Sequence, residues 1–272
     1  MTPRYLEAKP PASVRFRGAL VFLHGFPLNA RMWEPQFALA ERGWRVIAPQ
    51  FRGFDDAQGG QVSVNPQVEN CPPVTMDDYA GEVIDLLDAL HMHEAVVCGL
   101  SMGGYVAFAM LRHAARYVHA LILADTRPQA DTADGVEGRK RMLKLLTEKG
   151  PAAVADEMLP KLLGGTTRRD RSDLVEHVRA LVLSNGTGAI AGALHALMTR
   201  VDSTPLLGSI HVPALIVAGE EDTVTPPAVA EEMHRAIAGS ELAIISEAGH
   251  LSNVEQADAF NATLASFLEH RV

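Results

Sequence analysis

The segment AVVCGLSMGG, residues 95–104, carries the strongest pattern in this 272-residue chain. Four apolar residues lead into Gly99, and Ser101 stands between Gly99 and Gly103 at the start of an apolar, helix-like stretch. The pattern G-x-S-x-G between a strand and a helix is typical of a nucleophile elbow, a strained turn that holds the serine oxygen clear of the backbone. Neither G-x-G-x-x-G nor G-x-x-x-x-G-K occurs here, so a phosphate-binding loop is not indicated. We therefore predict that Ser101 is a catalytic nucleophile.

A serine hydroxyl is a weak nucleophile, so it needs a base that a third group orients. Among the 11 histidines, His250 stands out because it follows a strand-like run, residues 242–245, and precedes a helix-like stretch. That position places it at the same sheet edge as Ser101, and we predict that it is the base. His91 and His93 resemble a metal pair only weakly, since no third ligand lies nearby in the sequence. We predict no metal site.

The acid is predicted from its place in the chain. Asp222 follows the strand-like residues 214–218 and lies in the order Ser, Asp, His along the sequence. Asp125 is the alternative, because it also ends a strand-like run at the same edge. Glu220 and Glu221 are interpreted as solvated charges at the rim.

A developing oxyanion needs two hydrogen-bond donors aimed at it. The backbone N–H of Met102, directly after the nucleophile, is one candidate. The N–H of Phe26 is the other, since it lies in the turn that follows the strand-like residues 19–23. His24, in the same turn, is interpreted as a structural histidine.

Apolar strand-like runs alternate with amphipathic stretches along most of the chain. This alternation predicts an α/β fold with a doubly wound, mostly parallel sheet. Residues 126–205 break it, because they contain about four helical segments separated by glycine-containing turns and have no strand-like run. We predict that residues 1–125 and 206–272 form the core and that 126–205 form an all-helical cap, inserted between two core strands over their carboxyl ends.

Composition excludes several classes of protein. The 24 basic and 33 acidic residues give a net charge of −9, which disfavours a nucleic-acid partner. No run reaches the roughly 18 apolar residues of a membrane helix, and residues 1–5 lack the start of a signal peptide. The 2 cysteines are too few for a disulfide framework. These features predict a cytoplasmic protein with no membrane partner, and they leave its oligomeric state open.

The elbow, the turn at residues 24–27, the acid turn at 219–222 and Gly249-His250 together resemble the α/β-hydrolase superfamily over nearly the whole chain. The carboxylesterase, 3-oxoadipate enol-lactonase and cofactor-free haloperoxidase (perhydrolase) branches are the most similar. The resemblance implies a serine esterase that works without a cofactor on a small ester. A lactone substrate and peroxide as acyl acceptor are the alternatives, and a ligand-binding relative without turnover is a third. That last alternative is disfavoured by the complete set of Ser101, Asp222 and His250.

Three features bear on the substrate. Arg127 and Arg139 are candidates to clamp a dicarboxylate lactone, although surface ion pairs explain them equally well. Residues 54–73 form a long polar loop of a length that is uncommon in compact domains. This loop either shapes the pocket mouth or is a surface excursion. Apolar residues of the cap line an apolar pocket or form the cap's own core: Met142, Leu143, Leu146, Met158, Leu162, Leu163, Leu194 and Met198.

Overall fold

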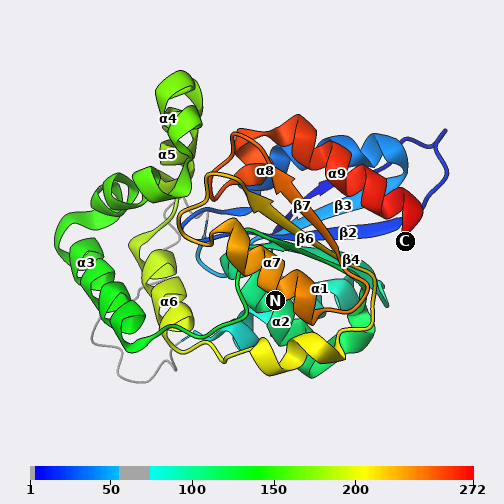
Figure 1. Ribbon diagram of the computed structural model, residues 1–272, viewed down its shortest axis with the longest axis horizontal. Helices are drawn as coiled ribbons and strands as arrows, with labels where there is room; N and C mark the ends of the chain where they lie inside the picture. The colour runs from blue at the N-terminus through cyan, green and yellow to red at the C-terminus, as the bar shows by residue number, and fades with distance from the viewer. Residues whose placement is uncertain (1–3, 55–73) are drawn as a thin grey trace.

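The computed structural model describes residues 4–54 and 74–272, and its centre is a seven-stranded sheet (Figure 1). The strand order is β1-β3-β2-β4-β5-β6-β7. β1 pairs with β3 in the antiparallel sense, and the other pairs are parallel. The strands are β1 (Tyr5–Ala8), β2 (Gly18–Leu23), β3 (Trp44–Pro49), β4 (Ala95–Leu100), β5 (Val118–Ala124), β6 (Ala214–Gly219) and β7 (Glu241–Ile245). The predicted doubly wound, mostly parallel α/β sheet is confirmed.

Continuous apolar runs form the central strands because helices cover both faces of the sheet. Every residue of β4 and β6 is buried. Helices α1, α2 and α7 pack on one face, whereas η1, α8 and α9 pack on the other (Figure 1). Their bounds are η1 (Ala30–Arg42), α1 (Met76–Ala89), α2 (Met102–Ala114), η2 (Ala115–Tyr117), η3 (Thr204–Ser209), α7 (Pro227–Ala236), α8 (Ser252–Glu255) and α9 (Ala257–His270).

Helix α1 begins with a capping box. The Thr75 hydroxyl accepts from the Asp78 N–H at 3.1 Å, and the Asp78 carboxylate accepts from the Thr75 N–H at 2.7 Å. This reciprocal capping box satisfies two N–H groups at the helix N-terminus that lack intrahelical partners. Thr75 is therefore the N-cap of α1.

The elements that the sequence does not predict include β1, η1 and α7. β1 has four half-buried residues at the edge of the sheet, too few for a periodic signal. η1 contains Pro35, and a proline inside a helical pattern argues against a helix. α7 begins at the second of two consecutive prolines, Pro226 and Pro227, a pair that is typical of a loop.

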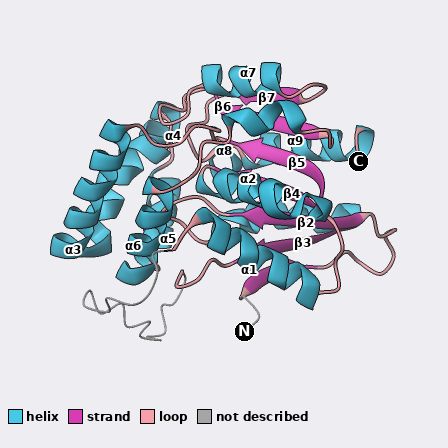
Figure 2. Ribbon diagram, turned by 90° about the horizontal axis from the view of Figure 1, so that it is seen from below, coloured by secondary structure: helices cyan, strands magenta, loops and turns pink. Residues whose placement is uncertain are grey.

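Four helices fill the interval between β5 and β6 and lie together beyond one end of the strands (Figure 2). They are α3 (Ala133–Leu162), α4 (Gly165–Asp170), α5 (Ser172–Leu183) and α6 (Thr187–Met198). α3 changes direction at Gly150, whose φ of 75° lies in the left-handed region that favours glycine. The division of the chain into a core and a separate cap at residues 126–205 stays a prediction.

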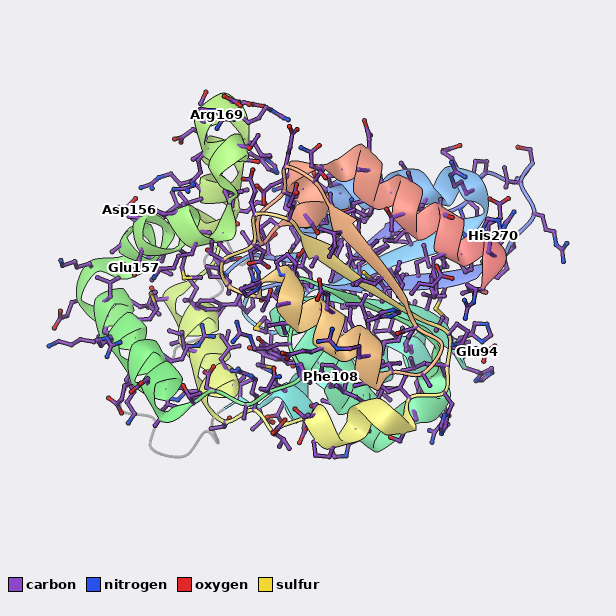
Figure 3. The ribbon with its side chains drawn as sticks, viewed as in Figure 1. Glu94, Phe108, Asp156, Glu157, Arg169 and His270 are labelled. Atoms are coloured by element: carbon purple, nitrogen blue, oxygen red, sulfur yellow. The ribbon has the colours of Figure 1, made fainter. Side chains whose placement is uncertain are left out.

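Several charged side chains of this segment lie on the outside of the molecule. Asp156 and Glu157 of α3 and Arg169 of α4 point outward, whereas Phe108 of α2 lies inside the molecule (Figure 3). Among the described residues, no single helix is both long and apolar enough to cross a membrane. α5 and α6 meet that criterion of length and composition only as a pair, and they are bent by 92° relative to each other.

The long loop predicted at residues 54–73 lies outside the described residues except for Phe54. The Phe54 side chain is buried and meets the His24 ring edge-on, with the ring centroids 4.8 Å apart.

Candidate active site

The turn between β4 and α2 holds Ser101 in a conformation that is uncommon for a residue with a side chain. Its φ is 53°, in the left-handed region. A Cβ atom on Gly99 would lie 2.3 Å from the carbonyl oxygen of Gly103. A Cβ atom on Gly103 would lie 2.0 Å from the carbonyl oxygen of Leu23. Both flanking glycines are therefore required by close backbone approach, which is the steric reason for the G-x-S-x-G pattern.

The structure brings Ser101, His250 and Asp222 together from three separate loops. His250 Nε2 lies 2.8 Å from the Ser101 Oγ, and His250 Nδ1 lies 2.8 Å from Asp222 Oδ2. With Nδ1 protonated, the ring donates to the carboxylate and accepts the serine proton at Nε2. His250 and Asp222 are both buried, at 2% and 3% exposure. The geometry suits a nucleophile, a base and an orienting acid, and these roles stay predictions.

Backbone and side-chain donors fix the Asp222 carboxylate. Its Oδ1 accepts from the N–H groups of Val224 and Thr225 at 2.7 and 2.9 Å, and its Oδ2 accepts from the Thr225 hydroxyl at 2.6 Å. Burial by itself would raise the pKa of Asp222, but the neighbouring His250 and the hydrogen bonds lower it. Burial would likewise lower the pKa of His250, but the charge and hydrogen bond of Asp222 raise it. The pair therefore favours a carboxylate beside an imidazole that readily accepts a proton.

Asp125, the alternative acid, has different partners. Its Oδ1 accepts from the Gly219 N–H at 2.8 Å, and its Oδ2 accepts from the Ser252 hydroxyl at 2.5 Å. Burial, with the nearby charge of Asp222, raises the pKa of Asp125 to about 8. Asp125 thus ties the end of β6 to the loop after His250, while Asp222 occupies the position at Nδ1.

The two predicted oxyanion donors lie next to the serine. Met102 is the first residue of α2, where a backbone N–H has no partner within the helix and the helix dipole is positive. Phe26 lines the same cavity as Ser101, and a Cβ on the adjacent Gly25 would lie 3.6 Å from the Ser101 Cβ. Within residues 4–54 and 74–272, neither N–H has a hydrogen-bond acceptor. Two unpartnered donors next to a nucleophile suit an oxyanion, and this role stays a prediction.

His24 is a fully buried histidine whose contacts are with aromatic neighbours. Its ring lies against Phe51, with centroids 4.4 Å apart, and its Nε2 accepts from the Phe51 N–H at 3.4 Å. Burial lowers the pKa of His24 to about 3, so the ring is neutral at physiological pH. These contacts suit the structural role that the sequence predicts for it.

A cavity of about 100 Å³ opens onto the serine, between the sheet edge and the helical segment. It is lined by Phe26, Ser101, Tyr105, Arg127, Asp131, Arg139, Met158, Leu197, Arg200, Val224 and His250. Of the apolar cap residues that the sequence offers as pocket lining, Met158 is the one that lines this cavity. Leu146, Leu162, Leu163 and Leu194 belong to the buried apolar core instead. Core packing, rather than substrate contact, therefore accounts for most of that apolar pattern.

Three arginines and one aspartate give this cavity a positive wall. Asp131 bridges two of the arginines, at 3.2 Å from Arg139 Nε and 2.7 Å from Arg200 Nη1. The Arg200 guanidinium also lies 4.5 Å from the centre of the Tyr105 ring. Sequence reasoning missed Asp131, Arg200 and Tyr105, because no local motif links residues so far apart in the chain.

Arg127 is the third arginine, and it differs from the other two. Its guanidinium donates to the carbonyl oxygen of Val224, and its positive charge acts to lower the pKa of His250. Within the described part of the chain, no carboxylate pairs with it. Arg127 is therefore available to an anionic group in the cavity.

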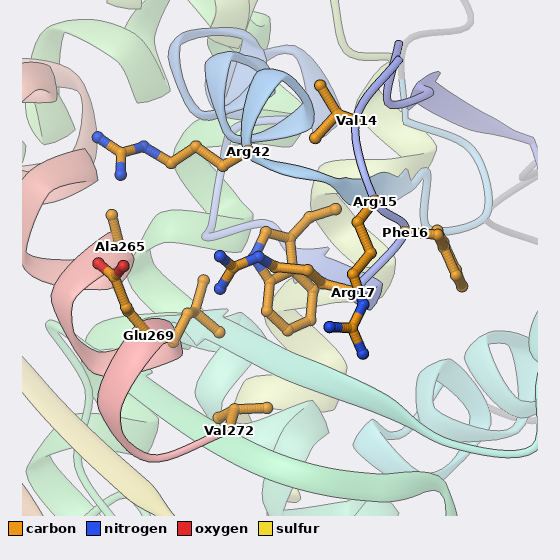
Figure 4. A pocket seen from close by; sticks show the side chains of 10 residues that line it. Val14, Arg15, Phe16, Arg17, Arg42, Ala265, Glu269 and Val272 are labelled. Carbon is orange, nitrogen blue, oxygen red and sulfur yellow. The ribbon is translucent and has the colours of Figure 1, made fainter. Parts of the chain in front are cut away.

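A larger groove of about 580 Å³ lies at the opposite end of β2 and β3, away from Ser101 (Figure 4). It is lined by Val14, Arg15, Phe16, Arg17, Arg42, Trp44, Ala265, Leu268, Glu269 and Val272. None of the predicted site residues is among them. Across the described residues, no group of three or more His, Cys, Asp or Glu side chains is arranged to hold a metal ion.

Comparison with known proteins identifies the family to which the chain belongs. A family model described as the alpha/beta hydrolase family matches residues 20–263. The chain is 30% identical over 260 residues to 3-oxoadipate enol-lactonase 1 of Acinetobacter baylyi, which covers 92% of this chain and 88% of that protein.

Two solved structures share the whole architecture. A thermophilic esterase from Thermogutta terrifontis is 33% identical, with a TM-score of 0.87, over 98% of this chain and 92% of that chain. The enol-lactonase from Burkholderia xenovorans is 25% identical, with a TM-score of 0.84, over 98% of this chain and 96% of that chain. Because the family match spans most of the sequence and the fold agrees over nearly all of it, this protein belongs to the alpha/beta hydrolase family.

Proposed function

We propose that this protein is a serine esterase that cleaves small carboxylic esters through Ser101, His250 and Asp222. The observation that carries the proposal is the unbroken chain of two 2.8 Å contacts from the serine oxygen through the imidazole to the buried carboxylate. A cavity of about 100 Å³ beside that oxygen suits a small substrate. The similarity to esterases and enol-lactonases supports hydrolysis of an ester bond, open-chain or cyclic.

The reaction proceeds in two halves. His250 takes the Ser101 proton while the serine oxygen attacks the ester carbonyl, and Asp222 stabilises the imidazolium that forms. The N–H groups of Met102 and Phe26 donate to the oxyanion, and His250 then protonates the departing alcohol. In the second half, His250 removes a proton from water, which attacks the acyl-enzyme carbonyl. His250 then returns that proton to the Ser101 oxygen as the bond to the acyl group breaks and the acid is released. Each step uses groups of the chain and water, so the mechanism calls for no cofactor.

Covalent labelling of the serine tests this function directly. We expect a fluorophosphonate to add one phosphonyl group per chain, located by peptide mass spectrometry at Ser101, because His250 activates that hydroxyl. An esterase panel of acyl esters of increasing length should show turnover for the short ones. A protein that remains unlabelled and hydrolyses none of them would instead be a ligand-binding relative without turnover.

A lactone that carries a carboxylate is the second candidate substrate, and Arg127 is the observation that favours it. The cavity wall is positive, and Arg127 has no carboxylate partner among the described residues. A guanidinium binds a carboxylate through charge-assisted hydrogen bonds. The thermophilic esterase from Thermogutta terrifontis was solved with malate bound, and malate is a dicarboxylate.

The variant Arg127→Met distinguishes the two substrate classes. We expect KM for a carboxylate-bearing lactone to rise about 10–100-fold, because a hydrogen bond to a charged group is worth about 1.5–3 kcal/mol. KM for a neutral acetate ester should stay nearly unchanged. Arg169→Met, an exposed residue of α4, is the matched control. Equal changes for both substrates would remove Arg127 from substrate recognition.

A further inference from the structure

A buried carboxylate outside the proposed catalytic set holds the backbone on both sides of His250. Glu255 is the last residue of α8 and is 4% exposed. Its Oε1 accepts from the Gly249 N–H at 2.9 Å and from the Leu251 N–H at 3.2 Å. One oxygen atom therefore fixes the two residues that flank the imidazole in sequence.

The other oxygen of the same carboxylate reaches the helical segment. Oε2 of Glu255 accepts from the N–H of Gly164, which caps the start of α4, at 2.8 Å. The two backbones are in close contact there, since a Cβ on Gly249 would lie 2.3 Å from the Gly164 nitrogen. Glu255 thus joins the histidine loop to the turn between α3 and α4.

A second carboxylate makes a parallel link on the acid side. Glu221, next to Asp222 in sequence, accepts from the Thr166 N–H at 2.9 Å and from the Thr166 hydroxyl at 2.5 Å. The turn at residues 164–166 is therefore bound both to the loop of the acid and to the loop of the histidine. Glu255 differs from Glu221 in being buried, and it also holds the histidine loop itself.

Burial of a carboxylate is costly unless hydrogen bonds compensate for the lost hydration. Burial raises the pKa of Glu255, while hydrogen bonds from the Thr167 side chain and from the N–H groups of Gly164, Leu251 and Gly249 act in the opposite direction. The loop at residues 246–251 is not a regular helix or strand, so its N–H groups have no ladder to bond with. The carboxylate supplies these acceptors at the place where the imidazole must be held.

We propose that Glu255 is a positioning residue, which sets the place of the His250 imidazole and couples the helical segment to it through Gly164. The proposal rests on the proposed esterase function, because the position of His250 matters most if it is the base. An imidazole displaced by about 1 Å costs about 100-fold in rate. The helical segment contributes Met158 to the cavity wall. Its bond to Glu255 therefore fixes the position of that wall relative to the reacting groups.

Two substitutions of Glu255 and one control test the proposal. Glu255→Leu removes the acceptor for the three backbone N–H groups and for the Thr167 side chain at similar side-chain volume. We expect kcat for a small neutral ester to fall about 100-fold with little change in KM. Glu255→Gln keeps one oxygen and turns an NH2 group toward a backbone N–H, so an intermediate loss of about 10-fold is expected. The rate of phosphonylation of Ser101 should fall in the same order. Glu220→Gln alters an exposed carboxylate near Asp222 and should behave as the wild type.

The outcomes separate this proposal from the function on which it rests. A Glu255→Leu protein that is folded by circular dichroism, with wild-type kcat per labelled serine, overturns the positioning role. A Glu255→Leu protein that loses thermal stability but keeps the wild-type kcat also overturns the positioning role. If Leu prevents folding, the Gln variant decides by the same measurements.

If the wild-type protein is neither labelled nor active, the proposed esterase function is wrong, and the kinetic tests of Glu255 no longer apply. The low-field proton resonance of the His250–Asp222 hydrogen bond then decides on Glu255. It should be present in the wild type and in Glu220→Gln, and broadened or lost in Glu255→Leu. An unchanged resonance in that variant would overturn the proposal.

Discussion

Ser101→Ala should lower kcat for ester hydrolysis by about 10⁴–10⁶-fold, the range seen when a catalytic serine is removed from a triad. Without the hydroxyl no acyl-enzyme forms, and His250 can only act on water, which is not held in place. The variant should still hydrolyse the ester about 10³–10⁴-fold faster than the uncatalysed reaction, because the Met102 and Phe26 donors still stabilise an oxyanion. Initial rates with a chromogenic acetate ester at high enzyme concentration measure both values.

Two further measurements make this prediction specific. Ser209→Ala removes an exposed hydroxyl in η3 and should leave kcat unchanged. Phosphonylation should disappear in Ser101→Ala and persist in Ser209→Ala. If Ser101→Ala keeps more than about a tenth of the wild-type kcat, the hydroxyl at the elbow is not the nucleophile.

Asp222→Asn should lower kcat by about 10⁴-fold, for a reason that the hydrogen bonds of this carboxylate make clear. Oδ1 accepts from the backbone N–H groups of Val224 and Thr225, so the oxygen of an asparagine amide stays there. The NH2 group then faces His250 Nδ1, which must accept instead of donate. That forces the ring proton onto Nε2, and the imidazole can no longer take the proton of Ser101.

The pH profile gives a second readout of the same variant. Neutral imidazole is the active base, and Asp222 raises the pKa of His250 above its ordinary value of 6.5. Wild-type kcat/KM should therefore fall on the acid side with a midpoint above 6.5. In Asp222→Asn the carboxylate charge is gone, so the midpoint should move to lower pH while the plateau drops.

Asp125→Asn is the matched control, because Asp125 is a second buried aspartate at the same sheet edge. The asparagine can still accept from the Gly219 N–H, so we expect a loss in kcat of less than about 10-fold. Rates and acid-limb midpoints of the two variants, measured side by side, decide between the carboxylates. A severe loss in Asp125→Asn with a mild one in Asp222→Asn would make Asp125 the acid.

Much of the fold could be predicted because its signals are local. Buried parallel strands are continuous apolar runs, and the predicted runs at residues 95–98 and 214–218 lie within β4 and β6. Thr75 marked the start of α1 through its capping chemistry. The glycine-containing turns that separate the helical segments of residues 126–205 are equally local. β1 was missed because its place in the sheet comes from pairing with β3, a contact between distant residues.

The predictions for the site divide in the same way. The sequence by itself determined where a serine could stand in a strained turn, because Gly99 and Gly103 are needed for backbone contacts within and beside the elbow. It also placed Asp222 and His250 after strands whose carboxyl ends meet at one edge.

Only the tertiary structure decided which carboxylate meets His250 Nδ1 and which arginines form the cavity wall. It also showed that one glutamate holds the backbone on both sides of the imidazole. These contacts join loops that lie close together only because of the way in which whole helices and strands pack. A hydrogen bond between residues 91 positions apart, as between Gly164 and Glu255, leaves no periodic trace in the sequence.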